Sequence, residues 1–235
     1  RDAALLARIG HSSAPRTYYH WIRDGVDFIN LDNAEDDAFD VAQLVWFDAI
    51  IDADLANPKV TTIVAGMHES LPYSKSDSHS MCGSLSGRES GNHVYIKLVD
   101  AQRSSRHVYL LSSHSHYYLA NIFDTEHWRD AGNDGAVLPG WVIGTAGAER
   151  YPLPAGVTPG PDAREHTYGY LLGSVKPGGT IDFAFHELAE RDLQAARTSD
   201  YGPEDIAFCV AQNPDPEKLR LIRSAPITCE EATLH

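Results

Sequence analysis

The sequence predicts an α/β domain, and three observations along its first third lead to that prediction. Residues 17–31 alternate apolar and polar side chains around an Asp-Gly dipeptide, a pattern typical of a β-hairpin. Residues 38–55 place apolar side chains at helical spacing, and an Asn-Pro dipeptide marks the end of that helix. Residues 60–67, VTTIVAGM, are a β-branched run too short for a typical helix, which indicates a buried strand.

The same signals predict the remaining elements in chain order. These are a Ser-rich loop over 70–90, a helix over 93–104, strands over 107–113 and 141–148, and a hairpin with strands 168–175 and 180–187. After this hairpin the chain is charged and dotted with proline, with one short helix expected near 203–212. We therefore expect one domain over residues 1–188 and a C-terminal tail with a short helix over 189–235.

The composition excludes several classes of protein. The chain has 235 residues, of which 43% are hydrophobic and 22% charged, as is ordinary for a globular domain. Its net charge of −14 argues against a nucleic-acid-binding surface or general binding to anionic membranes. No apolar run approaches the roughly twenty residues of a membrane-spanning helix, so no span is expected.

Three cysteines, Cys82, Cys209 and Cys229, cannot all pair within one chain. A bridge between Cys209 and Cys229 is one option, and three ordinary thiols are at least as good an interpretation. The compartment stays open on this evidence.

Histidines follow two of the expected buried strands. His68 comes directly after the strand over 60–67, and His114 and His116 follow the strand over 107–113. Histidines one residue apart point the same way on a strand, whereas on a turn they diverge enough to serve two neighbouring metals. Neutral imidazoles suit zinc, iron, nickel or copper, and manganese where carboxylates share the shell. A lone histidine is more often a hydrogen-bonded core residue, but the two motifs together favour a metal site.

The order of these segments resembles the C-terminal half of a calcineurin-like metallophosphoesterase, including the purple-acid-phosphatase branch. The matching segments are YYHWIRDGVDFINLDNA, QLVWFDAII, IVAGMHESLPYS and SSHSHYYLANIFD. They correspond to the family's YYSF-like strand, F-I-x-L-D strand, Q-L-x-W-L helix, strand ending in His, and G-H-x-H motif. The similarity covers residues 14–124, and LPGWVIGTAGAERYPLP with the later hairpin is similar in a less diagnostic way.

The resemblance implies a four-layer α/β/β/α sandwich with a binuclear metal centre at the strand ends. By analogy His68 and His114 would bind one metal and His116 the other, the ions being divalent or of the Fe, Zn or Mn type. Two such ions position a hydroxide and neutralise the phosphoryl oxygens during displacement. The implied substrate is a small-molecule or lipid-headgroup phosphoester. No catalytic acid or base is assigned, and the substrate, the metal identity and the oligomeric state stay open.

The sequence departs from the family pattern at two points. Ser113 stands where the family's last motif begins with glycine, which is acceptable if its φ is negative. The family's D-x-H, G-D and G-N-H-(D/E) motifs, which supply most carboxylate ligands, are expected upstream, yet sixteen residues precede TYYHWI. We therefore expect the chain to be the C-terminal portion of a longer phosphoesterase, with little hydrolysis by itself. A lost upstream signal peptide would be compatible with a secreted or periplasmic protein.

Two other functions compete with this interpretation. The first is a non-catalytic binding or interaction module that reuses the fold after losing its metal motifs. The second is a protein in which His68, His114 and His116 together form a single zinc site with one open position.

Overall fold

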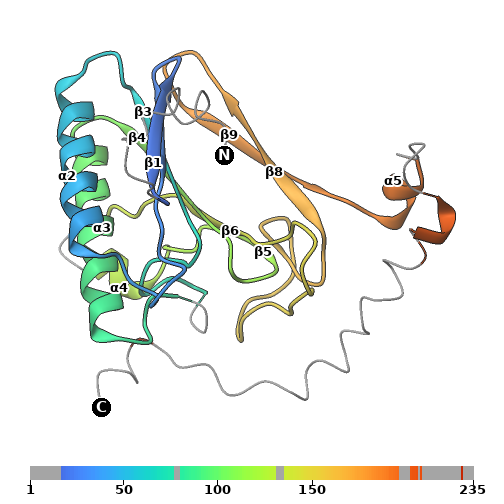
Figure 1. The fold of residues 1–235 in the computed structure, drawn as a ribbon. Coiled ribbons are helices and arrows are strands. Elements are labelled where there is room, and N and C mark those ends of the chain that lie inside the picture. Colours follow the sequence, from blue (N-terminus) through green and yellow to red (C-terminus); the bar gives the residue numbers. More distant parts are fainter. Residues whose placement is uncertain are drawn as a thin grey trace.

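The fold is taken from a computed structural model, which describes residues 17–76, 80–130, 135–195, 202–205, 207 and 229. It is a mixed α/β arrangement in which helices cover one face of a large sheet and a long hairpin crosses the other face (Figure 1). The α/β prediction is therefore confirmed. The four-layer sandwich is not confirmed, because the described residues form one large sheet, helices on one face of it and a separate two-stranded hairpin.

The helices and strands have the following bounds. They are β1 (Tyr19–Arg23), β2 (Val26–Asn30), α2 (Val41–Ala56), β3 (Thr62–Met67), α3 (Leu85–Arg103), β4 (His107–Ser112), β5 (Tyr118–Ala120), α4 (Glu126–Asp130), β6 (Gly140–Ile143), β7 (Ala163–Arg164), β8 (Gly169–Val175), β9 (Ile181–Glu187) and α5 (Glu190–Ala195).

The large sheet has seven strands in the order β1-β2-β3-β4-β6-β5-β7. Strands β2, β3, β4 and β6 are parallel, while β1, β5 and β7 pair antiparallel at the two sides. The carboxyl ends of β3, β4 and β6 therefore meet at one edge of the sheet, where open α/β sheets commonly place their functional residues.

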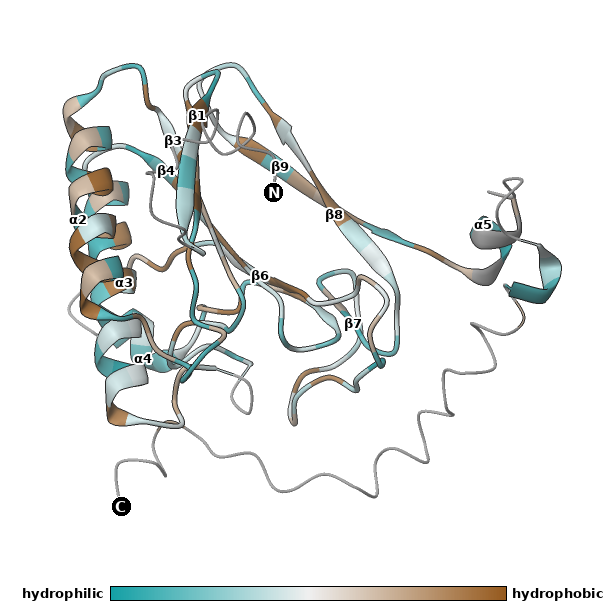
Figure 2. Cartoon of the chain, in the orientation of Figure 1, coloured by the Kyte–Doolittle hydropathy of each residue, from teal (hydrophilic) through white to brown (hydrophobic). Residues whose placement is uncertain are grey.

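The two faces of the sheet have separate cores because strand side chains alternate between faces. Ile63 and Ala65 of β3 face the helices and belong to the main core, in which Phe47 of α2 and Leu98 of α3 are fully buried. Val64 faces the opposite way and packs with residues of the hairpin. Figure 2 shows the corresponding hydrophobic colouring along the central strands and the helices.

The β8–β9 hairpin packs on the sheet through aromatic side chains. Phe183 lies 4.5 Å from the ring of Trp141, and Phe185 stacks on Tyr118 at 4.2 Å between ring centroids. At the hairpin turn, the hydroxyl of Thr62 donates a hydrogen bond of 2.6 Å to the Gly179 carbonyl. Burial of these large rings stabilises the hairpin against the sheet.

The sequence-based boundaries need two corrections. The segment 70–90 is not all loop, because α3 begins at Leu85, with the Ser84 hydroxyl accepting the Gly87 N–H at 3.0 Å. The strand expected over 141–148 ends at Ile143, because the chain then turns past the H-x-H loop. The short helix expected near 203–212 is helical at residues 203–205 and 207, and its remainder lies outside the described residues.

The cysteine pairing differs from the bridge considered for Cys209 and Cys229. Cys229 forms a disulfide with Cys82, and their Cα atoms lie 4.9 Å apart across a separation of 147 residues. Both cysteines are buried. Closeness along the chain was a poor guide here because the fold brings distant segments together. Cys209 lies outside the described residues.

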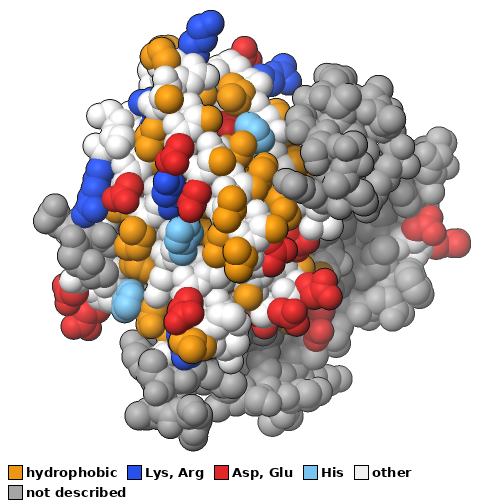
Figure 3. Space-filling model, turned by 60° about the vertical axis from the view of Figure 1, so that its left-hand side comes forward, with side chains coloured by type: hydrophobic (Ala, Val, Ile, Leu, Met, Phe, Trp, Pro, Cys, Tyr) orange, Lys and Arg blue, Asp and Glu red, His pale blue; other side chains and the backbone are white. Residues whose placement is uncertain are grey.

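The outer face of the helix layer is chemically mixed (Figure 3). Val41 and Val45 of α2 are exposed there, and Asp52 of α2 pairs with Lys97 of α3 at 2.6 Å. Among the described helices, none combines the length and the hydropathy that crossing a membrane requires.

Candidate metal centre

The strand order gathers the three histidines of interest at one edge of the sheet. His68 follows β3, and His114 and His116 lie on the loop after β4. β4 pairs with β3 on one side and with β6 on the other, so this loop lies between the ends of two neighbouring strands. The sequence prediction that both histidine motifs follow buried strands is confirmed.

His68 and His114 face each other directly. The Nε2 atom of His68 lies 2.8 Å from the Nδ1 atom of His114, and the two rings meet edge to face with centroids 4.7 Å apart. At this distance one nitrogen carries a proton and the other accepts it. Both side chains are partly or fully accessible to solvent. The two nitrogens thus converge at an accessible place, and a cation that binds both of them must displace the shared proton.

His116 points away from this pair. Its Nδ1 atom lies 2.6 Å from the carbonyl oxygen of Glu149, on the segment after β6, and its ring packs on Tyr151 at 4.2 Å. Because a carbonyl only accepts, Nδ1 carries the proton and Nε2 presents its lone pair in the neutral ring. Metal-binding histidines commonly donate their second nitrogen to a carbonyl in this way.

The turn between the histidines explains why they diverge. His114 has a φ of +42°, a left-handed conformation that histidine adopts more readily than branched residues do. Ser113 is not among the residues with positive φ, so serine fits at the place where the family has glycine. The reversal at His114 directs its ring toward β3 and leaves His116 beside the segment that follows β6.

A buried asparagine fixes the backbone of the first histidine. Asn33 is fully buried, and its Oδ1 accepts the N–H groups of His68 and Glu69 at 3.1 and 3.0 Å. Its Nδ2 donates a bond of 3.0 Å to the Glu69 carbonyl. These three bonds satisfy backbone groups that the end of β3 leaves without ladder partners.

Asn33→Ala is expected to lower the free energy of unfolding by about 3 kcal/mol, because two buried backbone groups of Glu69 and the partly buried N–H of His68 lose their partner. Urea denaturation followed by circular dichroism measures this loss. Asn30→Ala is the control, since Asn30 makes one exposed bond to the Thr17 carbonyl. Equal and small effects of the two substitutions would contradict the assigned role of Asn33.

Glu69 places a carboxyl group behind the histidine pair. Its side chain is 5% exposed, and Oε1 lies 3.4 Å from Nε2 of His114. Burial first, and then the nearby carboxyl of Asp37, raise the pKa of Glu69 to about 7. Glu69 is therefore only partly ionised near neutral pH. Within the described residues its Oε2 atom has no hydrogen-bond partner.

A cavity of about 340 Å³ opens beside His68. It is lined by Thr17, which precedes β1, and by residues at the ends of β2, β3 and β4, namely Asn30, Leu31, Asp32, Met67, His68 and Ser113. His68 therefore borders a space large enough for a small polar ligand.

The donor set fits part of a metal shell. The facing nitrogens of His68 and His114 are of the kind that first-row transition metals prefer, and they lie on the segments that follow two adjacent strands, β3 and β4. In the described ranges, no group of three or more His, Cys, Asp or Glu side chains converges on one point. These residues therefore supply two converging nitrogens, and a complete shell requires further donors.

Sequence reasoning missed the buried residues that organise this edge. Asn33 and Glu69 carried no recognisable signal, because their role depends on contacts between segments more than thirty residues apart. For Ser115 there was a weak signal. It stands between the two histidines of an H-x-H motif, so on an extended segment its side chain faces away from theirs.

No family model matches the chain, and no curated protein matches it with significance. Among solved structures, purple acid phosphatase PPD1 from yellow lupin (Lupinus luteus) seeds aligns at a TM-score of 0.45 with 18% identity, over 81% of this chain and 36% of that one. PhoD aligns at 0.38 with 13% identity, over 89% and 50%. HypX from Aquifex aeolicus aligns at 0.26 with 14% identity, over 43% and 19%.

These TM-scores are too low to carry an argument about fold or function. The chain spans at most half the length of these structures.

Proposed function

We propose that this chain belongs to a metal-dependent hydrolase of phosphoesters, of the calcineurin-like metallophosphoesterase type, and carries part of its binuclear site. The observation that carries the proposal is the pair of imidazole nitrogens, 2.8 Å apart, at the ends of adjacent parallel strands. The order of the four motifs quoted from the sequence supports it independently. The four-layer sandwich belongs to the same proposal, with the β8–β9 hairpin as part of its second sheet.

In this proposal His68 and His114 hold one metal ion and His116 holds the second through Nε2. The bond from Nδ1 of His116 to the Glu149 carbonyl fixes the ring in the tautomer that leaves Nε2 unprotonated. The remaining ligands come from outside the described residues. When bound, the metals supply positive charge that neutralises phosphoryl oxygens and activates water.

The surroundings of the pair suit a phosphoester in this scheme. The chain carries a net charge of −14, so an anionic substrate is repelled unless local cations reverse the potential. The cavity beside His68 is lined by Asn30 and Asp32, which can hydrogen-bond to the polar groups of a substrate. His68 forms part of the wall of this cavity, so a metal ion bound to His68 would face the cavity.

The single-zinc alternative receives less support from the geometry. It requires three imidazoles to converge, whereas His116 is bonded to Glu149 on the side of β6. The divergence favours separate roles for His114 and His116.

The assay is made on the full-length phosphoesterase of which this chain is proposed to be a part. There, His68→Ala and His114→Ala are each expected to lower the rate of hydrolysis about 100-fold or more, because each removes one metal ligand. The assay uses p-nitrophenyl phosphate and bis(p-nitrophenyl) phosphate with added Mn²⁺ or Zn²⁺. The two substrates distinguish a monoesterase from a diesterase.

His93→Ala is the matched control for these substitutions. His93 is an accessible histidine within α3, where it pairs with Asp48 of α2 at 2.8 Å. It does not lie on the segments that directly follow β3 and β4. Its loss is expected to leave turnover unchanged. Full activity in the His68 and His114 variants would contradict the proposal, and so would the absence of hydrolysis in the unsubstituted protein with either metal.

A further inference from the structure

A buried hydroxyl network lies under the H-x-H loop. Ser115, between the two histidines, is fully buried, and its Oγ lies 2.9 Å from Oγ of Ser76. Oγ of Ser76 also lies 2.7 Å from the Tyr117 hydroxyl. One hydroxyl can donate one bond and accept two, so Ser76 can serve both partners. Ser76 thus holds the loop at two points, one on each side of His116.

The opposite side of this loop is packed against backbone. At Gly144, just after β6, a Cβ atom would lie 2.1 Å from the carbonyl oxygen of Ser115, so the position requires glycine. Because Gly144 leaves no room there, the loop has little freedom to move away from Ser76. The rings of His114 and His116 therefore depend on where Ser76 holds Ser115.

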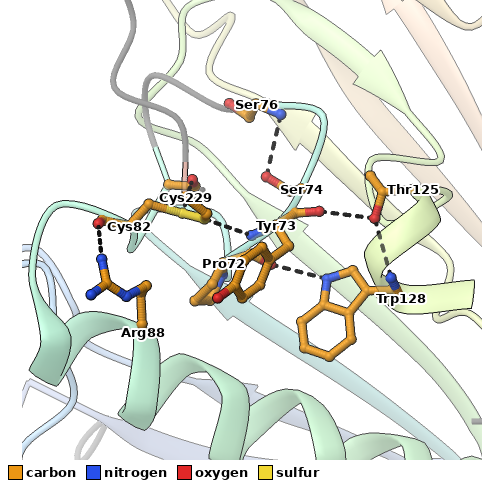
Figure 4. The surroundings of a disulfide bond; sticks show 10 residues. Pro72, Tyr73, Ser74, Ser76, Cys82, Arg88, Thr125, Trp128 and Cys229 are labelled. Atoms are coloured by element: carbon orange, nitrogen blue, oxygen red, sulfur yellow. Dashed lines mark hydrogen bonds between the residues drawn. A yellow bond between two sulfur atoms is a disulfide. The ribbon is translucent and has the colours of Figure 1, made fainter. Parts of the chain in front are cut away.

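Ser76 is itself anchored by the segment 72–76 and the disulfide (Figure 4). The Ser76 N–H donates to Oγ of Ser74 at 3.3 Å, and the Tyr73 N–H lies 3.1 Å from Sγ of Cys229. The same segment is held from α4, where the indole N–H of Trp128 donates to the Pro72 carbonyl at 3.0 Å and the Thr125 hydroxyl donates to the Tyr73 carbonyl at 3.0 Å.

We propose that Ser76 is a positioning residue for His114 and His116, and that the Cys82–Cys229 disulfide holds Ser76 in its place. Cys229 is joined to Ser115 by the hydrogen bond from Tyr73 to Cys229, by the peptide chain of residues 73–76, and by the hydrogen bond between Ser76 and Ser115. The inference rests on the proposed function only in assigning metals to the histidines. The effect on the histidine rings themselves does not require a metal.

The test records the histidine Cε1–Hε1 resonances of the metal-free full chain by ¹H–¹³C NMR. In Ser76→Ala, the His114 and His116 resonances are expected to shift or broaden, because Ser115 loses its buried partner. The resonances of His93 and His107, which contact Asp48 and the Gly178 carbonyl, are expected to stay in place.

Ser90→Ala is the matched control for loss of a buried hydroxyl. Ser90 is buried in α3 and bonds to the Phe39 N–H and the Gly87 carbonyl, with no contact to the H-x-H loop. A similar loss of thermal stability without the histidine shifts is expected for this variant. The comparison separates positioning from a general loss of packing.

Reduction of the disulfide tests the second half of the proposal. Once a thiol titration shows a gain of two thiols on reduction, the His114 and His116 resonances are expected to move as in Ser76→Ala, and reduction of that variant should add little. Unchanged resonances in Ser76→Ala would overturn the positioning role. Unchanged resonances after reduction would overturn the role of the disulfide. If Ser76→Ala does not fold, Ser115→Ala takes its place, because it breaks the same hydrogen bond. Its His114 and His116 resonances then test the positioning role.

A zinc titration of the same samples separates this proposal from the proposed function. Ser76→Ala is expected to bind Zn²⁺ about tenfold more weakly than the unsubstituted chain, as is typical when an outer hydrogen bond is lost. Failure of the unsubstituted chain to bind Zn²⁺ would contradict the proposed function, and the metal-free spectra would still decide the role of Ser76.

Discussion

Removal of the Cys82–Cys229 disulfide is expected to lower the free energy of unfolding by about 3–5 kcal/mol. The bond closes a loop with a separation of 147 residues, and cross-linking so long a loop removes much conformational entropy from the unfolded chain. It also joins Cys229 to the segment that follows His68, where Cys82 is 1% exposed and Cys229 3%. The folded state therefore loses a buried contact as well.

Cys229→Ser measures this effect in urea denaturation without a reductant, and Cys209→Ser is the matched control. The first variant is expected to show the full loss. The second is expected to stay within about 0.5 kcal/mol of the unsubstituted protein, since Cys229 already has its partner in Cys82. Equal losses in both variants, or none in Cys229→Ser, would contradict the pairing.

Stability is expected to fall as the pH rises from about 4 to about 7, because of a buried acidic pair away from the metal edge. Asp27 of β2 and Asp54 of α2 are buried side by side, with His20 of β1 at 2.8 Å from Asp27. Burial first, and then the charge of Asp27, raises the pKa of Asp54 to about 7. The N–H groups of Arg106 donate to the Asp54 and Leu55 carbonyls and complete the cluster.

The direction of this pH dependence follows from whether the folded or the unfolded chain binds more protons. The unfolded chain loses the Asp54 proton near its ordinary pKa of 3.8, whereas the folded chain keeps it to about 7, so stability falls across that window. The hydrogen bond to Asp27 raises the pKa of His20, and the folded chain therefore also holds this proton above 6.5. The stabilisation by the His20 proton is fully present below pH 6.5 and is lost as the pH rises through the raised pKa of His20. The rise of the Asp54 pKa from 3.8 to about 7 corresponds to a loss of at most about 4 kcal/mol in the free energy of unfolding across this window.

Asp54→Asn is expected to remove the part of this dependence that comes from Asp54, because the amide stays neutral and can still donate to Asp27. The part that comes from Glu69, whose pKa is also raised to about 7, is expected to stay. The measurement is the free energy of unfolding of both proteins at intervals from pH 4 to 8. The difference between them should grow with pH up to about 7, with the variant more stable at the upper end. Asp52→Asn, on the exposed side of α2, is the control. Parallel curves for Asp54→Asn and the unsubstituted protein would contradict the buried pair.

Much of this fold follows from local patterns in the sequence. The Asp24-Gly25 turn has positive φ at both residues, as a tight hairpin requires, and β3 and β4 lie within the segments predicted as strands over 60–67 and 107–113. These elements were predictable because hydrophobic periodicity and turn residues act over short distances. The start of α3 was missed because its N-terminal turns contain serine and glycine instead of apolar residues.

The candidate site was predictable only in part. The positions of His68, His114 and His116 after buried strands follow from the sequence, since parallel strands end at a common edge. The facing geometry of His68 and His114 depends on the β3–β4 register, and the direction of His116 depends on contact with the segment after β6. The pairing of Cys82 with Cys229 depends likewise on tertiary structure, which no local pattern encodes.

The most direct test of the metal site is a Zn²⁺ titration of the purified chain against a chromophoric chelator near neutral pH. The facing nitrogens of His68 and His114 predict that the unsubstituted chain binds Zn²⁺, that His68→Ala and His114→Ala each bind it at least about tenfold more weakly, and that His93→Ala binds it unchanged. The same affinity in all four proteins, or no binding by the unsubstituted chain, would contradict the account.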